Sequence, residues 1–523
     1  MSMSQSSRRA GVNIPLFSIR TAHQWGVGEI ADLVPFAAWA KRAGFSTIQL
    51  LPVNEPSHGQ NSPYMARSAF AIDPAYLSME SIEDFKDAGG VAALSPEMRR
   101  TLDEARAQKE VRWDLVRRVK DAALALAFNR FHSNVWKKGG ARDQAFNAFC
   151  ERERGWQYEY ALFSAIADSQ SGHSWQIWPD ALRNRQPEAL KEAAAKHADR
   201  ILYYQYVQWL LDEEWRAARA GAEKLGVSLM GDLPFMVSTD SSDVWSRSRE
   251  FRFDATIGVP PDAFSAEGQN WGLPVFRWDV MRTNDYEWMR LRAARAAEQF
   301  GLYRIDHVVG LYRTYFITTD KTQKGFIPDG EPAQIAQGER LIEILRDGGG
   351  AMLSGDKVIA EDLGTVPPFV RASLTRLGVP GYRVLRWEKD DHVFRDPAKW
   401  PALSVATTGT HDTESLAEWY DALPAWERKH FLSLPGLEGL RESGSRFDDH
   451  ARDALLELVQ RSGSSLSLVP FQDAMGSRER VNLPGSVADT NWSYRMAQTV
   501  DALAADTETT ERLRAIAHRG GRA

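Results

Sequence analysis

The chain has 523 residues with 43% hydrophobic and 26% charged side chains, a balance typical of globular proteins that excludes a largely disordered chain. Its length is several times the common domain size, so it can form about three domains or one decorated α/β barrel. The 64 basic and 70 acidic residues leave a net charge of −6, which argues against nucleic acid or another polyanion as a partner.

The single cysteine and the apolar runs bear on cellular location. Cys150 cannot form an internal disulfide, and no neighbouring residue activates its thiol, so we interpret it as a bystander. The first apolar stretch, residues 12–19, contains Asn13 and Pro15 and therefore resembles a strand more than the core of a signal peptide. No run approaches the roughly 18 apolar residues of a membrane span. We therefore expect a cytoplasmic protein with no membrane partner.

Short runs rich in Val, Ile and Leu recur along the chain, with amphipathic stretches of helical spacing between them. Strands that alternate with helices indicate a parallel sheet with crossover connections. Eight such runs predict an α/β fold of the (β/α)8 TIM-barrel type, with a doubly wound open sheet as the alternative. In chain order the expected strands are 12–19, 47–53, 227–236, 301–307, 357–364, 382–387, 403–412 and 466–475.

The spacing of these runs is uneven. Residues 81–200 hold no convincing strand, so we predict a large helical insertion between strands two and three, flanked by 1–80 and 201–523. Residues 237–285 are rich in Pro, Gly and aromatic residues and predict a long irregular loop at the C-terminal face of the barrel, where active sites lie. The last twenty residues predict a short helix with a frayed basic end, RGGRA.

Aromatic residues are numerous, with 18 Trp, 14 Tyr and 23 Phe. Many lie beside Gly, Pro, Asn, Gln or His, as in HQWG, HSWQIWP, GQNWGLP and TNWSYR, which is typical of loops rather than of a core. Aromatic faces in a cleft give rigid contact area to ligands with apolar faces, and a pyranose ring is one such ligand.

Acidic residues stand at the ends of several expected strands. Asp306 ends GLYRIDH, Glu361 and Asp362 end KVIAEDLG, Asp412 ends LSVATTGTHD, and Asp232 interrupts VSLMGDLPFM. Burying an unpaired carboxylate is costly, so these residues are not core filler. Each could form a salt bridge with a nearby Arg304, His307 or His411, but three carboxylates that converge on one barrel face favour a catalytic site.

The combination of carboxylates and aromatic loops points to glycosidic chemistry. Cleavage of a glycosidic bond needs one carboxylate as nucleophile and one carboxylic acid as proton donor, and a third can hold sugar hydroxyls. The histidines His23, His58, His307 and His411 are scattered, and no HxH or HExxH motif occurs. We expect neither a metal nor a cofactor.

Motifs spread over residues 11–495 resemble the 4-α-glucanotransferases of the amylomaltase (disproportionating enzyme) type, relatives of the α-amylase group. They follow the family's order along the chain: WGVGEIADL, NSPYMARSAFAIDP, GDLPFMVSTDSSDVW, VPPDAFSAEGQNWGLPVF, YRIDHVVGL, VIAEDLGTVP, TGTHDTESL and VPFQDAMGSRERVNLPGSVADTNWSYR.

The resemblance implies roles for individual residues. It makes Asp306 the nucleophile, Glu361 the acid/base and Asp412 the stabiliser of the transition state. Arg304 lies two residues before Asp306 and points to the same face of the strand, where it could keep that carboxylate ionised. A dry setting or the neighbouring negative charges would keep Glu361 protonated.

Other residues become candidate sugar ligands through the same resemblance. Each could instead brace its own loop or pair with a neighbouring carboxylate, and Asp232 is either a site residue or a salt-bridge partner at the barrel mouth. The expected substrate-binding residues are Tyr64, Asp262, Gln269, Trp271, Arg304, His307, His411 and Asn482.

The implied activity is transfer of α-1,4-glucan segments between malto-oligosaccharides through a covalent glycosyl-enzyme. Retention of configuration predicts that the carboxyl groups of Asp306 and Glu361 lie about 5–5.5 Å apart. An α-glucan hydrolase with the same carboxylates and a non-catalytic glucan-binding protein remain the alternatives.

Two segments depart from the family's pattern. After Asp306 the chain reads VVGLYRTYFI where many relatives have a Trp-containing aromatic run. The stretch KGFIPDGEPAQIAQGER replaces the family's Gly-aromatic-Val-Tyr-Pro type of sequence. The second departure suggests a different preference for the acceptor.

Overall fold

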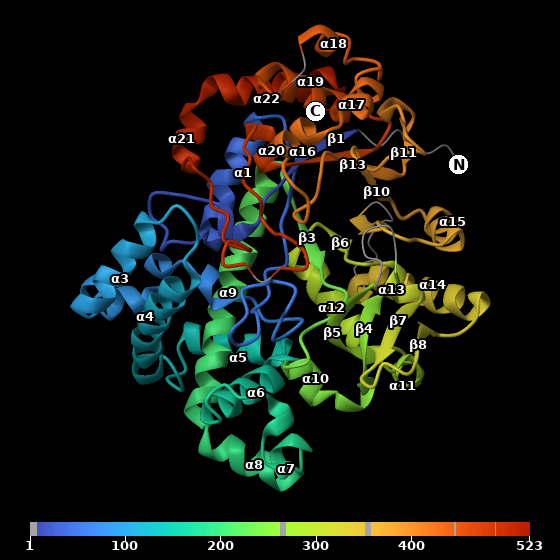
Figure 1. Ribbon diagram of the computed structural model, residues 1–523. Helices are drawn as coiled ribbons and strands as arrows, with labels where there is room; N and C mark the ends of the chain where they lie inside the picture. Colours follow the sequence, from blue (N-terminus) through green and yellow to red (C-terminus); the bar gives the residue numbers. More distant parts are fainter. Residues whose placement is uncertain (1–7, 262–267, 351–356, 444–445, 487, 523) are drawn as a thin grey trace.

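A closed barrel of eight parallel strands forms the centre of the molecule in the computed structural model, which describes residues 8–261, 268–350, 357–443, 446–486 and 488–522 (Figure 1). The strands follow one another around the barrel in the order β1-β14-β13-β10-β9-β6-β3-β2. The predicted (β/α)8 barrel is therefore confirmed, and the open-sheet alternative is wrong. The strands are β1 (Arg9–Asn13), β2 (Thr47–Gln49), β3 (Ser228–Leu233), β6 (Leu302–Ile305), β9 (Val358–Ala360), β10 (Gly381–Val384), β13 (Ser404–Thr407) and β14 (Leu466–Pro470).

The first strand differs from the expectation for residues 12–19. It ends at Asn13, and a 3-10 turn over Leu16–Ser18 follows Pro15. Proline has no N–H to donate to a sheet ladder, so the apolar run leaves the barrel there although its side chains stay buried.

Side chains from alternate strand positions fill the barrel. Because successive side chains point to opposite faces of a strand, one set packs inside the barrel and the other packs against the surrounding helices. The inner cluster comes from barrel strands alone and consists of Met230, Leu302, Ile359, Tyr382, Val405, Leu466 and Leu468.

Helices dominate the segment between β2 and β3 (Figure 1). The last of them, α9, runs over Ala198–Lys224 and leads directly into β3. The division of the chain into 1–80, 81–200 and 201–523 stays a prediction. The preceding α-helices are α2 (Glu83–Asp87), α3 (Pro96–Ala107), α4 (Trp113–Asn134), α5 (Ala141–Arg152), α6 (Gln157–Ser169), α7 (Asp180–Arg183) and α8 (Pro187–Lys196).

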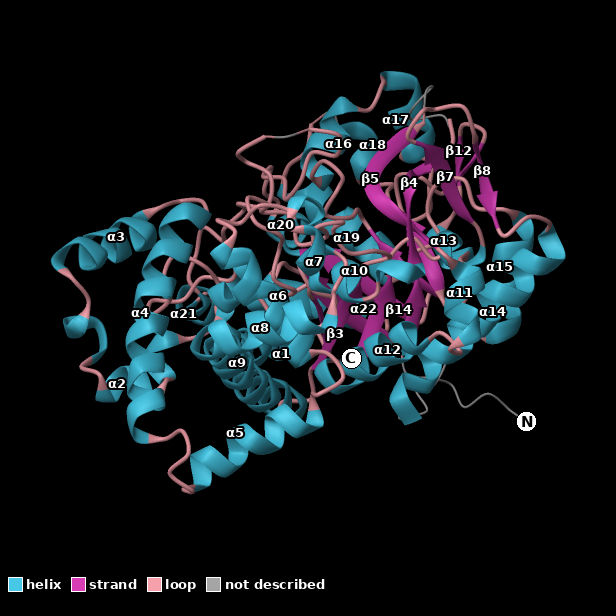
Figure 2. Ribbon diagram, turned by 90° about the horizontal axis from the view of Figure 1, so that it is seen from below, coloured by secondary structure: helices cyan, strands magenta, loops and turns pink. Residues whose placement is uncertain are grey.

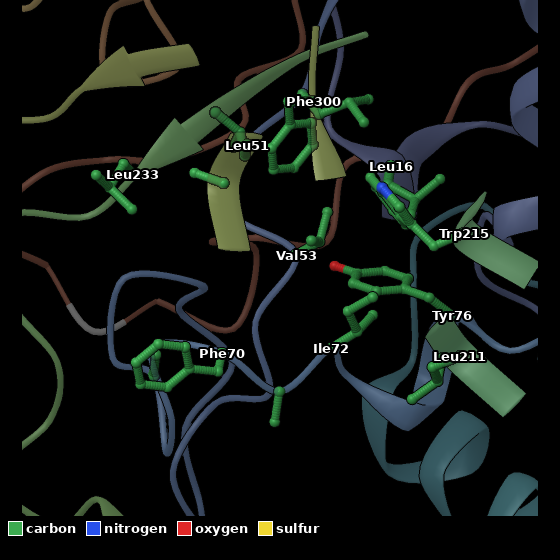
Figure 3. Close-up of a cluster of buried hydrophobic side chains, with 14 of the residues drawn as sticks. Leu16, Leu51, Val53, Phe70, Ile72, Tyr76, Leu211, Trp215, Leu233 and Phe300 are labelled. Atoms are coloured by element: carbon green, nitrogen blue, oxygen red, sulfur yellow. The ribbon is translucent and has the colours of Figure 1, made fainter. Parts of the chain in front are cut away.

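The hydrophobic core is continuous between these helices and the barrel. Figure 3 shows Val53, Phe70 and Ile72 from the segment after β2 in one buried cluster with Leu211 and Trp215 of α9. All five side chains are buried. The segment after β2 is thus anchored by its packing against α9. This packing holds the rest of that segment at the mouth of the barrel.

The remaining helices cover the barrel in the usual alternation. A short hairpin of β11 (Lys389–Asp390) and β12 (Val393–Phe394) follows β10. None of the helices that the structure describes is both long and apolar enough to cross a membrane. The other α-helices are α1 (Leu33–Arg42), α10 (Ser242–Ser246), α11 (Trp278–Thr283), α12 (Glu287–Gln299), α13 (Val309–Tyr312), α14 (Glu331–Asp347), α15 (Pro368–Leu377), α16 (Leu416–Ala422), α17 (Ala425–Phe431), α18 (Leu440–Ser443), α19 (Asp449–Gln460), α20 (Phe471–Met475), α21 (Val500–Ala505) and α22 (Thr507–Arg519).

A four-stranded antiparallel sheet lies outside the barrel (Figure 2). Its order is β5-β4-β7-β8, formed by β5 (Gln269–Phe276), β4 (Phe251–Val259), β7 (Thr314–Thr318) and β8 (Lys324–Ile327). The expectation that 237–285 is an irregular loop is therefore wrong, because β4 and β5 fall within it. Strand β4, inside the sheet, pairs with β7 from a distant part of the chain. The local pattern of hydrophobic residues does not reveal such a pairing.

The C-terminal residues are not frayed. Arg522 is buried, and its guanidinium donates hydrogen bonds to the carbonyl oxygens of Gln460, Ser462 and Ser464 and to that of Arg9. Burial lowers the pKa of Arg522 to about 9. The basic tail therefore closes the end of the barrel at which β1 and β14 begin.

Candidate active site

A cavity of about 680 Å³ opens at the C-terminal ends of the barrel strands. It brings together segments that are far apart in the sequence, and the three predicted catalytic carboxylates all line it. Of the predicted substrate-binding residues, all but Asp262, which lies outside the described residues, also line it. The lining includes Tyr64, Phe235, Gln269, Trp271, Arg304, Asp306, His307, Glu361, Leu363, Trp387, His411, Asp412, Asn482, Leu483 and Trp492.

Arg304 on β6 links the carboxylates at the floor of this cavity. One terminal nitrogen, Nη1, lies 2.7 Å from both carboxylate oxygens of Asp232 on the neighbouring strand. The other, Nη2, lies 2.9 Å from Asp306 Oδ1 and 3.8 Å from Glu361 Oε2. Burial alone would lower the pKa of Arg304, but Asp232 and Asp306 raise it well above its usual range. The guanidinium therefore stays charged.

Asp306 and Glu361 lie at adjacent strand ends. Asp306 Oδ2 accepts a hydrogen bond from the backbone N–H of Phe235, whereas Glu361 accepts from the N–H groups of His307 and Leu363 at 2.8 and 3.0 Å. Because both carboxylates contact Arg304 Nη2, the two contacting oxygens can be no further apart than the sum of those distances. That limit admits the spacing of a retaining pair without fixing it, so the separation of about 5–5.5 Å stays a prediction.

The environment of Glu361 favours its protonated form. Burial raises the pKa of Glu361 to about 8, and the negative charge of Asp306 acts in the same direction against the opposing charge of Arg304. Near neutral pH the site thus holds a carboxylic acid beside a carboxylate that is ion-paired with arginine. Two carboxyl groups with opposite protonation states are what acid-assisted nucleophilic cleavage requires.

Asp412 follows β13 and faces the same cavity. Its Oδ1 accepts a hydrogen bond from Asn482 Nδ2 at 2.6 Å, and its Oδ2 lies 3.4 Å from His411 Nε2. Burial alone would raise the pKa of Asp412, but His411 and Asn482 lower it to about 2. Asp412 is therefore ionised near neutral pH.

An aromatic wall stands beside Asp412. The ring of Tyr64 is stacked on His411 with centroids 5.2 Å apart, and Trp492 packs against both rings. The Tyr64 hydroxyl donates to Asp232 Oδ2 at 2.7 Å. Asp232 itself lies beneath the cavity, with its carboxylate fully occupied by Arg304 and Tyr64.

The opposite wall comes from β5 and the turn after β6. The Trp271 ring meets His307 edge-on with centroids 4.8 Å apart, and its Nε1 donates to Gln269 Oε1. Burial lowers the pKa of His307 to about 4, so its imidazole is neutral at ordinary pH. Gly310 is needed behind it, because a Cβ there would lie 2.6 Å from the Phe235 ring and 2.8 Å from His307.

Several lining residues were not predicted, and three of them, Trp387, Leu483 and Trp492, present large apolar side chains to the cavity. Trp387 and Leu483 are 41% and 46% exposed, and Trp492 completes the aromatic wall. Trp387 ends the strand-like run 382–387, so an aromatic residue at a strand end was a usable signal. No sequence signal pointed to Leu483. Among the described residues, no group of three His, Cys, Asp or Glu side chains could hold a metal ion.

Comparisons with known sequences agree on one family. The profile of the family described as 4-alpha-glucanotransferase matches residues 14–500. The 4-alpha-glucanotransferase of Chlamydia pneumoniae is 33% identical over 515 residues, covering 95% of this chain and 93% of that protein. The enzyme of the same name from Thermus thermophilus is 33% identical over 514 residues, covering 94% and 96%.

Solved structures share the fold at lower identity. The amylomaltase from Streptococcus agalactiae, in complex with acarbose, superposes with a TM-score of 0.84 at 23% identity and covers 99% of this chain and all of that one. The amylomaltase from Corynebacterium glutamicum gives a TM-score of 0.78 at 22% identity, with 98% and 75% covered. At these identities the likeness concerns the fold alone.

Proposed function

The chain belongs to the 4-alpha-glucanotransferase family, and we propose that Asp306, Glu361 and Asp412 divide the chemistry of its transfer reaction among them. The single observation that carries this assignment is the pairing at Arg304. One guanidinium contacts both Asp306 and Glu361, while burial keeps Glu361 protonated. The two carboxyl groups thus lie side by side in environments that suit one as the nucleophile and the other as the acid.

The first step forms a covalent glycosyl-enzyme. Asp306 attacks the anomeric carbon of the donor glucan as the bond to the glycosidic oxygen breaks, and that oxygen takes the proton of Glu361. The shortened glucan then leaves with its new 4-hydroxyl. Asp412, held ionised by His411 and Asn482, stabilises the positive charge that develops on the sugar ring.

The second step reverses the first with another sugar. Glu361, now a carboxylate, accepts the proton of an acceptor's 4-hydroxyl while that oxygen attacks the anomeric carbon and displaces Asp306. Two displacements restore the α configuration. Neutral His307, Gln269 and Trp271 lie on the side of Glu361 at which leaving and incoming sugars must pass.

The substrate is a malto-oligosaccharide or longer α-1,4-glucan in this proposal. The packed rings of Tyr64, His411 and Trp492 form the wall for the donor sugar next to Asp412, and exposed Trp387 and Leu483 extend the apolar surface. A ligand role for Asp262 and a cytoplasmic location stay predictions.

Incubation with maltotriose alone tests transfer against hydrolysis. We expect a ladder of longer maltodextrins together with glucose and almost no gain in reducing ends, because transfer conserves the number of glycosidic bonds. Glucose and maltose with rising reducing ends and no longer products would mean that water is the acceptor.

The change Asp306→Asn tests catalysis against mere binding. It should lower transfer by at least about 10³-fold while leaving affinity for maltotriose within a few-fold, because the amide keeps the shape of the side chain but is not a nucleophile. If the wild-type protein and this variant bound sugar equally and were equally inert, the chain would be a binding protein.

A further inference from the structure

A second, smaller chamber adjoins the catalytic cavity on the side of the antiparallel sheet. Its volume is about 220 Å³, and it shares Gln269, Trp271, His307, Glu361 and Leu363 with the catalytic cavity. The rest of its wall comes from β4, from the segment after β6, from β8 and from the turn after β9: Gly258, Val259, Pro260, Val309, Arg313, Tyr315, Phe326, Gly364 and Thr365. A sugar that reaches Glu361 through this chamber is on the acceptor side of the proposed reaction.

Both segments that depart from the family's sequence pattern meet in this wall. Arg313 comes from VVGLYRTYFI, and Phe326 comes from KGFIPDGEPAQIAQGER. The Arg313 guanidinium lies over the Phe326 ring at 4.0 Å from its centroid. Tyr315, on the strand that begins one residue after Arg313, packs against the same ring at 5.1 Å. The two departures therefore build one feature, an arginine whose guanidinium carbon lies over an aromatic ring.

Arg313 is a cation without a carboxylate partner among the residues that the structure describes. Neither an ion pair nor a hydrogen bond to its guanidinium occurs there, and its Nε is buried without a partner. Burial lowers its pKa, yet an arginine remains charged at any physiological pH. Stacking on Phe326 fixes the guanidinium plane and leaves its edge free to donate paired hydrogen bonds.

His307 and Glu361 are the other groups of this chamber whose charge bears on an incoming acceptor. Burial lowers the pKa of His307 to about 4, so its imidazole is neutral. Glu361 is a carboxylate when the acceptor enters and lies 3.8 Å from Arg304, so Arg313 is the unpaired cation among the described residues of the lining. A partly enclosed chamber with one unpaired positive charge attracts anions, and a guanidinium edge matches a carboxylate or a phosphate.

We propose that Arg313 is a specificity-determining residue of the acceptor side, which makes this enzyme transfer glucan preferentially to hexoses that carry an anionic group. This inference rests on the proposed function. The bonds exchanged are those of ordinary transfer: the acceptor's 4-hydroxyl attacks the anomeric carbon, the bond to Asp306 breaks, and Glu361 takes the hydroxyl proton. The anionic group is bound and does not react.

The test is a competition between acceptors in transfer from maltotriose. Glucose serves as the neutral acceptor, and glucose 6-phosphate and glucuronate serve as anionic acceptors, because all three offer a free 4-hydroxyl. Two anions distinguish a preference for phosphate from a preference for carboxylate. We expect at least one anion to exceed glucose several-fold in kcat/KM at low ionic strength, and we expect the ratio to fall with added salt.

Three variants test whether Arg313 causes the higher kcat/KM with anionic acceptors than with glucose. Arg313→Met should bring the anion-to-glucose ratio to about one, whereas Arg313→Lys should keep part of the preference because the charge remains. The matched control is Arg252→Met on β4. Arg252 also stacks on a phenylalanine of this sheet, Phe316, but it is paired with Asp254 and does not line the chamber.

The outcomes separate this inference from the proposed function. Transfer to glucose with an anion-to-glucose ratio that is the same in wild type, Arg313→Met and Arg252→Met would overturn the inference and leave the transferase intact. A ratio that falls equally in both Met variants would also overturn it, since the effect would then belong to the sheet. Absence of transfer to every acceptor would refute the function itself.

Discussion

The guanidinium of Arg304 contacts the carboxylate of Asp306, two residues further along the chain, at 2.9 Å. The same side chain holds the fully buried Asp232 through its other terminal nitrogen. Asp232 therefore fixes Arg304, and Arg304 fixes the carboxylate that we propose as the nucleophile. Electrostatic pre-organisation of this kind requires that the supporting charge be buried and already paired before substrate arrives.

Removing this arginine should damage both stability and catalysis. In Arg304→Met, Asp232 is left buried without its partner, so the free energy of unfolding should fall by about 3–5 kcal/mol. Transfer should fall by more than about 10²-fold because Asp306 loses its ion pair. Urea denaturation and initial rates with maltotriose measure the two effects. The double variant with Asp232→Asn should regain stability but not activity; regained activity would mean that Arg304 serves only to neutralise Asp232.

The protonation state of Glu361 predicts how the reaction depends on pH. The acid form is required for departure of the first glucan, so kcat/KM should fall as pH rises through about 8, the raised pKa of Glu361. Glu361→Gln should lower transfer from maltotriose by about 10²–10⁴-fold. With α-glucosyl fluoride, whose leaving group needs no acid, this variant should form the glycosyl-enzyme readily and lack the alkaline limb. If kcat/KM of the variant still fell at alkaline pH as in the wild type, a group other than Glu361 would cause that fall.

The same group has a predictable effect on stability. Its folded-state pKa lies above that of the unfolded chain, so the folded protein binds the proton more tightly. Wild type should therefore lose stability relative to Glu361→Gln as pH rises from about 5 to 8, with no further change above that range. Thermal unfolding of both proteins across this range measures the difference, and parallel curves would contradict the assignment.

Asn482 should support catalysis by holding Asp412. Its side chain donates to Asp412 Oδ1 at 2.6 Å, and a hydrogen bond to a charged group contributes about 1.5–3 kcal/mol. Asn482→Ser should therefore lower kcat/KM by roughly 10–100-fold with little change in thermal stability. Asn147→Ser, which removes a similar bond to Asp143 on α5, is the control and should leave the rate unchanged.

The buried Arg522 near the C-terminus should contribute to the stability of the protein and not to its catalysis. Arg522→Met removes hydrogen bonds to four carbonyl oxygens, of which those of Gln460 and Ser462 also accept from Arg8, and should lower the free energy of unfolding by about 2–4 kcal/mol, while kcat stays within two-fold of wild type. The control is Arg519→Met, which removes only a half-exposed ion pair with Glu457 and should cost less than about 1 kcal/mol. Equal effects would show that the tail is dispensable.

Buried parallel strands were visible in the sequence because both of their faces are apolar. The runs around Ile48, Met230 and Ile359 are therefore rich in large apolar side chains, and each of the eight expected runs overlaps a barrel strand. Strand β4 escaped notice because one of its faces is open to solvent, where Phe253 is 41% exposed. Its partner β7 comes from another part of the chain. The prediction of a frayed C-terminal end was wrong because the hydrogen-bond partners of Arg522, near Arg9 and Ser462, are distant in sequence.

The sequence by itself determined the barrel and placed Asp306, Glu361 and Asp412 at its mouth, because strand ends follow from local hydrophobic pattern and all parallel strands end at the same face. Only the tertiary structure decided how these carboxylates differ. Burial, the shared contact with Arg304 and the bonds from His411 and Asn482 set their protonation, and these depend on distance through space and on exclusion of water. The position of Arg313 over Phe326 beside Glu361 has the same origin, since no local pattern encodes which loops meet.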